Sequence, residues 1–323
     1  MPGHRRPRRS NPGLILGILI VLGVVSLIGM SAAVSRAAHP ESNATAPGRW
    51  SQPDFPGPST AASSAQAQPN PVTSAPSTTA RIPPRPQKVI KLGDNPVFAD
   101  LGLPTVGCTL PRLGADVAAQ TAFYQAEVDC LNRVWLPVLA AAGLPADRPE
   151  LAVPTGPYST PCGNKSPTDN ANYCEGVIYM PPRYFSEVER VTANQPAVFL
   201  GVLAHEYGHH VQELSGVMDA AWGQRYEVGL GSPTGLEVSR RNELGATCFG
   251  GMFLASVAGH GSVTRELLDQ VARDQARRGD IPGSGLARDH GTTQNNSAWF
   301  TNGVRHNRTS ACNTWQAPPQ SVA

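Results

Sequence analysis

The stretch AVFLGVLAHEYGHHVQELSG at residues 197–216 constrains the fold more than any other part of the chain. It is an apolar run that leads into His205, Glu206 and His209, in the pattern H-E-x-x-H. On a helix, residues four apart lie one turn apart on the same face, so two imidazoles can bind one metal ion. Glu206 follows the first imidazole and can act as general base toward a water on that metal. The segment therefore predicts a buried helix that carries a metal site.

The same pattern also arises by chance in long sequences, so its surroundings must support it. Pro196 suits the first turn of a helix, and Ser215-Gly216 suits its end. His210 lies beside the motif, and three histidines with one glutamate within six residues are costly in a core unless they are partnered. These surroundings favour a metal site over a chance match.

A catalytic zinc site has three protein ligands and an open position for water, so one more ligand is needed. His210 points about 100° away from His209 around the helix, and Val211 to Val217 contains no histidine. A carboxylate from another helix is therefore expected. The candidates are Glu213, Glu227, Glu237 and Glu243.

Glu243 is the favoured third ligand. Small residues follow it at helical spacing, namely Ala246, Thr247 and Gly250, and they allow its helix to approach the first helix closely. The other three candidates stay open, although two arginines at helical spacing after Glu237 indicate a solvated ion pair there.

Helical patterns outnumber strand patterns along the rest of the chain. Helices are expected over 115–142 with a break or kink near Pro137, over 236–258 and over 263–278, and less certainly over 221–228. Residues 154–174 indicate a long loop, and GVIYM at 176–180 indicates a short strand. In many zinc peptidases a strand beside the active helix pairs with extended substrate, and GVIYM is the candidate for it. The expected fold class is α+β, predominantly helical, with a small sheet beside the helix that carries the motif.

The N-terminal part indicates export from the cytoplasm. A basic segment at 1–13 precedes residues 14–30, which are apolar except for Ser26 and span roughly 25 Å as a helix. This favours an uncleaved signal anchor over a cleaved signal peptide, whose apolar region is usually about 7–15 residues long. Residues 31–94 are rich in Pro, Ser, Thr and Ala and are expected to form a disordered linker. The folded domain is expected over 95–323, outside the cytoplasm, or secreted if the N-terminal segment is cleaved.

The charge balance gives no sign of a nucleic-acid partner. The net charge is +2, and four arginines lie in the basic N-terminal segment, so the rest of the chain carries 2 − 4 = −2. No basic patch remains outside that segment. The expected contacts are a protein or peptide substrate and the membrane, and the sequence does not indicate an oligomeric state.

The cysteines also indicate an oxidising compartment, because six of them lie beyond residue 100. Six cysteines allow 15 sets of pairs. Cys162 and Cys174 bracket a polar loop and are expected to pair. The pairs Cys108–Cys130 and Cys248–Cys312 would complete the set. Ligation of zinc by cysteine is disfavoured because the chain has no C-x-x-C pair.

Three motifs resemble the neutral zinc metallopeptidases, a family of bacterial proteins with a gluzincin-like site. They are HEYGHHVQ at 205–212, ELGATCFGG at 243–251 and HGTTQNNSAWFTNG at 290–303. The segment from Cys162 to Tyr173-Cys174 and VIYM also fits, and the resemblance extends from about Asp100 to Trp315. It implies a zincin-like metallopeptidase domain. It also implies zinc ligation by His205, His209 and Glu243, with Glu206 as catalytic base.

The chain departs from the family at Thr247, where the usual pattern E-L-x-A-D-C has Asp. In related gluzincins that Asp accepts a hydrogen bond from a ligand histidine. Thr247 accepts a hydrogen bond but supplies no charge. Loss of such a partner typically costs about 10–100-fold in metal affinity or activity, so a weakened enzyme is an open alternative.

His290 belongs to the third motif, and two roles stay open for it. It can donate a hydrogen bond to the oxyanion that forms when water attacks a carbonyl. It can equally cap a helix or support the fold.

The expected function is zinc-dependent hydrolysis of peptide bonds outside the cytoplasm. The rival is a zinc-stabilised binding or scaffolding domain at the cell envelope that keeps the metal for folding. Hydrolysis of another amide, such as a peptidoglycan cross-link, is a third and weaker hypothesis.

Overall fold

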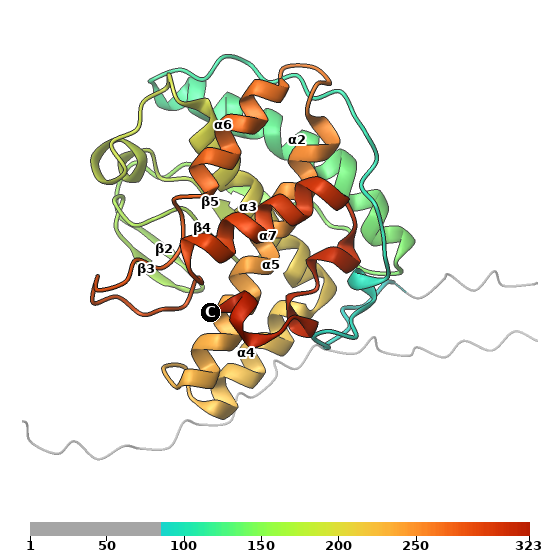
Figure 1. Ribbon diagram of the computed structural model, residues 1–323. Helices are drawn as coiled ribbons and strands as arrows, with labels where there is room; N and C mark the ends of the chain where they lie inside the picture. Colours follow the sequence, from blue (N-terminus) through green and yellow to red (C-terminus); the bar gives the residue numbers. More distant parts are fainter. Residues whose placement is uncertain (1–84) are drawn as a thin grey trace, which may run out of the picture. The chain divides into compact units, whose positions relative to one another are not determined.

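The computed structural model describes residues 85–323 (Figure 1). The expected signal anchor and nearly all of the expected linker lie outside the described residues. Among the helices of residues 85–323, none combines the length and the apolar character needed to cross a bilayer. The Val89 amide donates to the Ser215 carbonyl at 3.0 Å, and the Asn95 side chain donates to the same oxygen at 2.9 Å. Contacts with the domain thus begin before the expected start at residue 95.

Helices make up most of the described part, and the short strands form two small sheets. The helices are α2 (Val117–Ala141), α3 (Pro196–Ser215), α4 (Val217–Val228), α5 (Pro233–Val257), α6 (Arg265–Gln275) and α7 (Thr293–His306). Shorter helical turns are η1 (Pro96–Phe98), η2 (Tyr184–Val188), η3 (Thr309–Cys312), η4 (Thr314–Gln316) and η5 (Pro319–Val322). The strands are β1 (Glu150–Ala152), β2 (Tyr158–Thr160), β3 (Gly163–Lys165), β4 (Asn172–Cys174) and β5 (Val177–Tyr179). The predicted fold class, α+β and predominantly helical, is confirmed.

Local sequence signals explain where the helices begin and end. Side chains of Asp116, Ser232 and Thr292 cap α2, α5 and α7 by accepting a backbone amide of the first turn. α3 begins at Pro196 and ends at Gly216, whose φ of 89° lies in the left-handed region that glycine tolerates. α2 continues through Pro137, so the helix does not break there.

The sheets correct two predictions. The expected loop at 154–174 contains β2, β3 and β4, each only three residues long, which is too short to show an alternating pattern. β5 lies in the middle of the order β1-β5-β4, paired in parallel with β1 and antiparallel with β4. The prediction that GVIYM pairs with substrate is therefore wrong, because both of its edges are occupied. Within the described residues, β1 and β4 are the edge strands of this sheet, and each has one unpaired edge.

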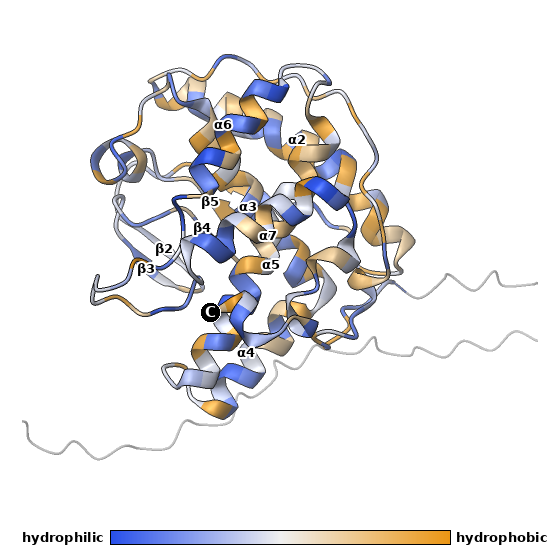
Figure 2. Cartoon of the chain, in the orientation of Figure 1, coloured by the Kyte–Doolittle hydropathy of each residue, from blue (hydrophilic) through white to orange (hydrophobic). Residues whose placement is uncertain are grey.

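α3 lies at the centre of the helical part and packs against α2, α5 and α6. Nearly every residue of α3 from Ala197 to Ser215 is buried. In Figure 2, hydrophobic and hydrophilic colours alternate along α6. The helix that carries H-E-x-x-H is thus the core helix, as its apolar run predicts.

α3 and α5 approach each other backbone to backbone at a glycine. A Cβ atom placed on Gly208 would lie 2.5 Å from the carbonyl oxygen of Ala246 and 2.8 Å from its Cα. On α5, a Cβ on Gly250 would lie 3.3 Å from the backbone of Ala204. The small residues after Glu243 therefore do allow the close approach that the sequence indicates.

Gly208→Ala is expected to lower the free energy of unfolding by about 1–3 kcal/mol, the usual cost of overpacking. It should also weaken metal binding, because it forces apart the two helices that carry the histidines and Glu243. Gly223→Ala in α4 is the matched control, since a Cβ there meets nothing within 4 Å and alanine favours helix. Urea unfolding of the variants measures the difference. A Gly208→Ala protein as stable as the control contradicts the close packing.

The three predicted disulfides are confirmed. Cys108 pairs with Cys130, Cys162 with Cys174, and Cys248 with Cys312, with no free cysteine among the described residues. The last pair links α5 to η3 across 64 positions of sequence. Three disulfides are typical of proteins that fold in an oxidising compartment.

One carboxyl group is buried in the core without a partner. Glu127 of α2 has no exposed surface, and neither of its oxygens has a hydrogen-bond partner. Burial raises the pKa of Glu127 well above its usual value. Burial therefore favours the protonated form of this side chain in the folded protein relative to the unfolded chain. Stability from this group is fully present below the unfolded pKa and is lost as pH rises toward the folded pKa.

Glu127→Gln is expected to remove this pH dependence, because glutamine stays neutral. The wild-type free energy of unfolding should fall relative to the variant by up to about 1.4 kcal/mol per pH unit above pH 5. Urea unfolding at pH 5 and pH 8 measures it, with exposed Glu150→Gln as control. Parallel pH dependences of wild type and Glu127→Gln would show that the carboxyl group is ionised in the fold.

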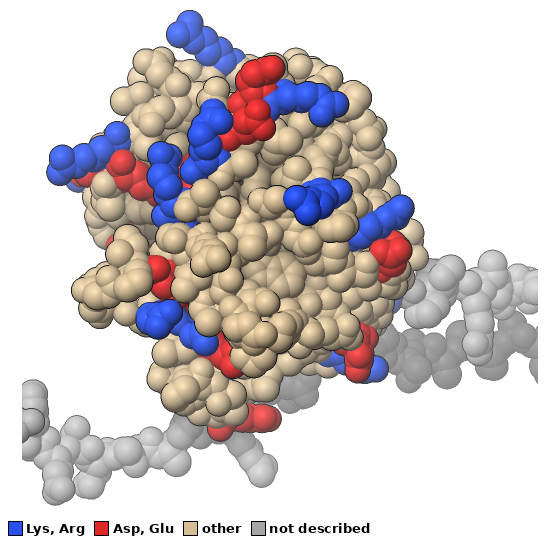
Figure 3. All heavy atoms as spheres, in the orientation of Figure 1, with Lys and Arg blue, Asp and Glu red and all other residues tan. Residues whose placement is uncertain are grey.

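Charges of both signs share the surface in view. In Figure 3, Lys and Arg side chains stand beside Asp and Glu over this face, between wide areas of uncharged residues. This face offers no continuous basic surface.

Candidate metal centre

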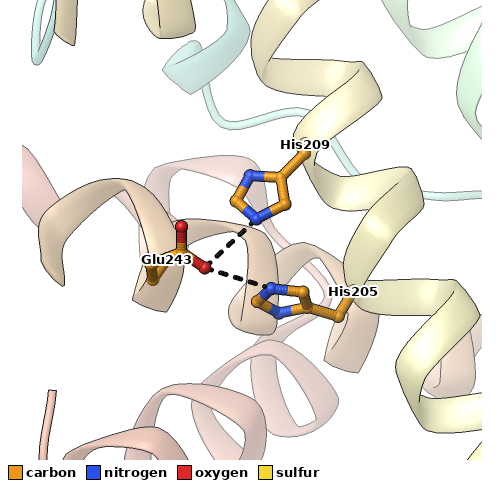
Figure 4. A group of neighbouring side chains, drawn as sticks. All are labelled: His205, His209 and Glu243. Atoms are coloured by element: carbon orange, nitrogen blue, oxygen red, sulfur yellow. Dashed lines mark hydrogen bonds and ion pairs between the residues drawn. The ribbon is translucent and has the colours of Figure 1, made fainter. Parts of the chain in front are cut away.

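Two imidazoles from α3 and one carboxylate from α5 converge on a point (Figure 4). Glu243 Oε2 lies 3.3 Å from His205 Nε2 and 3.2 Å from His209 Nε2. The two imidazole rings stand at 90° to each other, with centroids 4.8 Å apart. The four-residue spacing on α3 therefore brings both histidines to Glu243, as the helical geometry predicts.

These distances fit a zinc ion. Ligand atoms about 2.0–2.1 Å from a tetrahedral zinc lie about 3.3 Å from one another, which matches the separations between Glu243 and the two histidines. Two imidazole nitrogens with one carboxylate oxygen form the His₂Glu set of catalytic zinc sites. His205, His209 and Glu243 offer ligand atoms that all lie within 4.8 Å of one another and could hold a metal ion.

Glu243 and the two histidines stabilise the charged forms of one another's side chains. Burial alone raises the pKa of Glu243, but the histidines outweigh it and hold that pKa well below its usual value. Burial lowers the pKa of His209, yet the Glu243 carboxylate prevails and raises it to about 9. A carboxylate that stays ionised in a buried place is suited to bind a cation.

The Nδ1 atom of each imidazole lies within hydrogen-bond distance of a neutral side-chain oxygen. His205 Nδ1 lies 3.1 Å from Thr247 Oγ1, and His209 Nδ1 lies 2.9 Å from Gln212 Oε1. Gln212 in turn donates to the Asn242 carbonyl at 2.6 Å. Such contacts orient the rings so that each Nε2 faces Glu243. Sequence reasoning missed Gln212, although it follows His209 by three residues, a spacing that places both side chains on one face of a helix.

Glu206 lies beside the two histidines and lines the cleft at the metal centre. It is 7% exposed, and burial raises its pKa, an effect that His205 and His209 oppose. The carboxylate thus lies next to the candidate metal ligands in the cleft. This position suits a general base.

His290 reaches the centre from the loop between α6 and α7. Its Nε2 lies 3.9 Å from Glu243 Oε2, and its Nδ1 lies 2.7 Å from Asp289 Oδ1. The contact with Asp289 raises the pKa of His290 to about 9. The capping alternative fails, because Thr292 caps α7. Sequence reasoning missed Asp289, since neighbours in a loop give no periodic signal.

Asp280, Asp289 and His290 form a second group of potential ligands. Both oxygens of Asp280, however, already accept backbone amides, from His290 at 3.1 Å and from Gly291 at 2.8 Å. Asp280 thus stabilises the loop that carries His290.

The three other carboxylates proposed as ligands lie elsewhere. Glu213 accepts from Lys88 at 3.4 Å, and Glu237 pairs with Arg241 at 2.7 Å, the ion pair that the sequence indicates. Glu227 is exposed on α4. His210 also turns away, between the Tyr173 hydroxyl at 3.0 Å and the Asp147 carbonyl at 2.9 Å.

A cleft of about 630 Å³ opens over the metal centre. β4 and η2 line it together with α3, α5 and the loop that follows α6. Its apolar walls include Val202, Ile281 and Leu286, the last two on the surface loop with their side chains largely exposed. A ligand of peptide size can thus reach the metal centre from solvent.

A core helix with two histidines and a glutamate, joined by a carboxylate from a second helix, defines a zincin-like metal centre. The chain matches the family described as "Putative neutral zinc metallopeptidase" over residues 113–315, and it belongs to that family.

Curated relatives are similar over part of their length. YpfJ of Escherichia coli (strain K12), described as uncharacterized, is 27% identical over 185 residues, which cover 52% of this chain and 62% of YpfJ. Rv2575 of Mycobacterium tuberculosis (strain H37Rv), also described as uncharacterized, is 26% identical over 232 residues, 64% of this chain and 74% of the relative. The chain thus spans less than two thirds of YpfJ. No solved structure matches the chain.

Proposed function

We propose that the protein is a zinc-dependent endopeptidase that cleaves protein or peptide substrates outside the cytoplasm. One observation carries the proposal: His205, His209 and Glu243 converge at the distances of a zinc site, with Glu206 beside them in an open cleft. The family supports zinc as the metal. The three disulfides support an oxidising compartment. Attachment to the membrane through residues 14–30 belongs to the same proposal and rests on the sequence alone.

The residues around the centre fit the steps of amide hydrolysis. Zinc, when bound, supplies a Lewis acid that polarises a carbonyl and lowers the pKa of a coordinated water. Glu206 takes a proton from the attacking water and passes it to the leaving nitrogen. His290 donates from Nε2 to the carbonyl oxygen as that atom gains negative charge. Asp289 holds the His290 ring in this orientation by accepting from Nδ1.

The open edge of β4 supports an extended peptide as substrate. Asn172 and Tyr173 of β4 line the cleft, and the described residues leave the outer edge of this strand unpaired. An extended segment can add to such an edge through backbone hydrogen bonds. His210 supports the strand from α3 through the Tyr173 hydroxyl. β4 thus takes the role that the sequence gave to GVIYM.

Removal of the metal tests the proposal. Dialysis against a chelator is expected to abolish hydrolysis of an unfolded casein substrate by the purified chain, and added zinc should restore it. Peptide cleavage is followed by release of a fluorescent label. Full activity of the zinc-free chain contradicts the proposal.

The rival function is a zinc-stabilised binding domain at the cell envelope. It draws on Thr247, which gives His205 a neutral partner where the family pattern has a carboxylate. The two functions differ in turnover, because a binding domain retains zinc without cleaving any peptide. A chain that holds zinc and cleaves no casein or other unfolded protein favours this rival.

A further inference from the structure

Thr247 is the first member of a buried chain of hydrogen bonds that runs from His205 through Asn296 to Gln275. Its hydroxyl lies 3.1 Å from His205 Nδ1 and 2.9 Å from Asn296 Oδ1. The Asn296 amide nitrogen lies 2.7 Å from the Gln275 carbonyl and 3.2 Å from Gln275 Oε1. The three side chains come from α5, α7 and the end of α6, and all are buried.

The donor and the acceptor in each of these hydrogen bonds can be assigned by starting from Gln275. The carbonyl and Oε1 of Gln275 are acceptors, so the Asn296 nitrogen faces them and Oδ1 faces Thr247. A hydroxyl beside an amide oxygen must donate to it, which leaves the lone pairs of the Thr247 oxygen for His205. His205 Nδ1 therefore carries a hydrogen and donates it. The lone pair of Nε2 is then free on the side that faces Glu243.

The packing of the helices keeps this chain in place. Gln275 lies against α3 at Gly201, where a Cβ would come within 3.0 Å of the Gln275 amide nitrogen. Asn296 is 6% exposed and Thr247 2% exposed, so water does not compete for these bonds. Asn296 lies within the motif at 290–303, and its position next to the metal centre gives that motif a second contact with the site besides His290.

We propose that Thr247, Asn296 and Gln275 form a neutral relay that fixes the tautomer and the orientation of His205 for zinc. This inference rests on the proposed function and deepens it. The relay supplies the alignment that a carboxylate partner provides in related sites, without its charge. Asn296 and Thr247 act as positioning residues, because they act on the metal through His205. Thr247 is then compatible with a working zinc site.

Zinc affinity of the full chain, measured by competition with a chromophoric chelator, tests the relay. Thr247→Val keeps the shape and removes the hydroxyl, and it should weaken zinc binding by about 10–100-fold, the usual effect of losing such a partner. Thr247→Ser should restore affinity to within about threefold of the wild type. Asn296→Ala should also weaken binding. In the Thr247→Val background, however, Asn296→Ala should add no further loss, because the relay is already broken.

Matched variants separate the relay from general destabilisation. Asn302→Ala removes another α7 asparagine that donates to a backbone carbonyl, and Thr309→Val removes another buried hydroxyl that binds backbone. Both should lower the unfolding midpoint of the metal-free chain without changing zinc affinity. If Thr247→Val does not fold, Asn296→Ala against Asn302→Ala decides the question.

The outcomes are distinguishable. A wild-type chain that folds but binds no zinc overturns the proposed function and the relay together. Wild-type zinc binding that Thr247→Val or Asn296→Ala leaves unchanged overturns the relay alone. Fully additive losses in the double variant also overturn it, because they mean that the two residues act separately.

Discussion

Glu206→Gln is expected to leave the fold and the zinc content unchanged while lowering peptide hydrolysis by about 10²–10⁴-fold, the contribution of a positioned general base. The amide has nearly the size of the carboxylate, so the buried position beside His205 and His209 is kept. It cannot accept a proton from water at neutral pH. The kcat/KM for an unfolded casein substrate measures the loss, and elemental analysis of the same sample measures zinc.

Two results of this experiment carry different meanings. A zinc-loaded Gln variant with full activity refutes the role of Glu206. A variant that loses zinc as well as activity shows that Glu206 supports the metal, and the assignment of Glu243 as third ligand then needs revision. His290→Gln in the same assay should lower kcat and leave KM nearly unchanged, because the His290 contact forms with the developing oxyanion.

Glu243→Ala is expected to weaken zinc binding strongly. Loss of a residue that only supports a ligand costs about 10–100-fold in affinity, and loss of the ligand itself should cost more. The variant removes the carboxylate that lies 3.3 Å and 3.2 Å from the two imidazole nitrogens. It leaves His205 and His209 as the remaining ligands of the cluster. Competition with a chromophoric chelator measures the dissociation constant.

Glu237→Ala is the control for this prediction. Glu237 lies on the same helix α5, two turns before Glu243, and its carboxylate binds Arg241 instead of facing the histidines. Its removal should cost stability through Arg241 and leave zinc affinity unchanged. If Glu237→Ala, and not Glu243→Ala, releases zinc, the third ligand has been placed on the wrong residue.

Helical spacing predicts what lies on one helix and on its close neighbour. The i, i+4 histidines, the buried first half of α3 and the small face of α5 after Glu243 are all visible in the sequence, because each depends on a period of 3.6 residues. Cys248 and Cys312 pair as expected, although 64 positions separate them. Once Cys162 is paired with Cys174, the other four cysteines can pair in only three ways.

Contacts between distant polar residues carry no such period. Thr247 contacts Asn296 across 49 positions of sequence, and both residue types are frequent at helix caps for reasons unrelated to a metal site. Nothing local marks either one as part of a relay. Asp289 becomes relevant only when the loop after α6 brings His290 to Glu243. The place of β5 in the middle of its sheet depends on β1 and β4, whose three residues each are too few to predict pairing.

The neutral partners of both imidazoles bear on how the centre would work. Thr247 and Gln212 orient the rings of His205 and His209 without adding negative charge. Glu243 is then the one anionic ligand of the cluster. We expect a metal in this site to be a stronger Lewis acid than a metal whose histidine ligands donate hydrogen bonds to carboxylates, since the imidazoles here pass less electron density to it.

The most direct test of the account is the zinc content of the purified chain. Elemental analysis of the wild type should give close to one zinc per chain, and His205→Ala, prepared in parallel, should give almost none. Both proteins should be folded by circular dichroism, so that the comparison concerns the site alone. A well-folded wild type with little or no zinc, even after incubation with the ion, would contradict the central claim that His205, His209 and Glu243 form a zinc site.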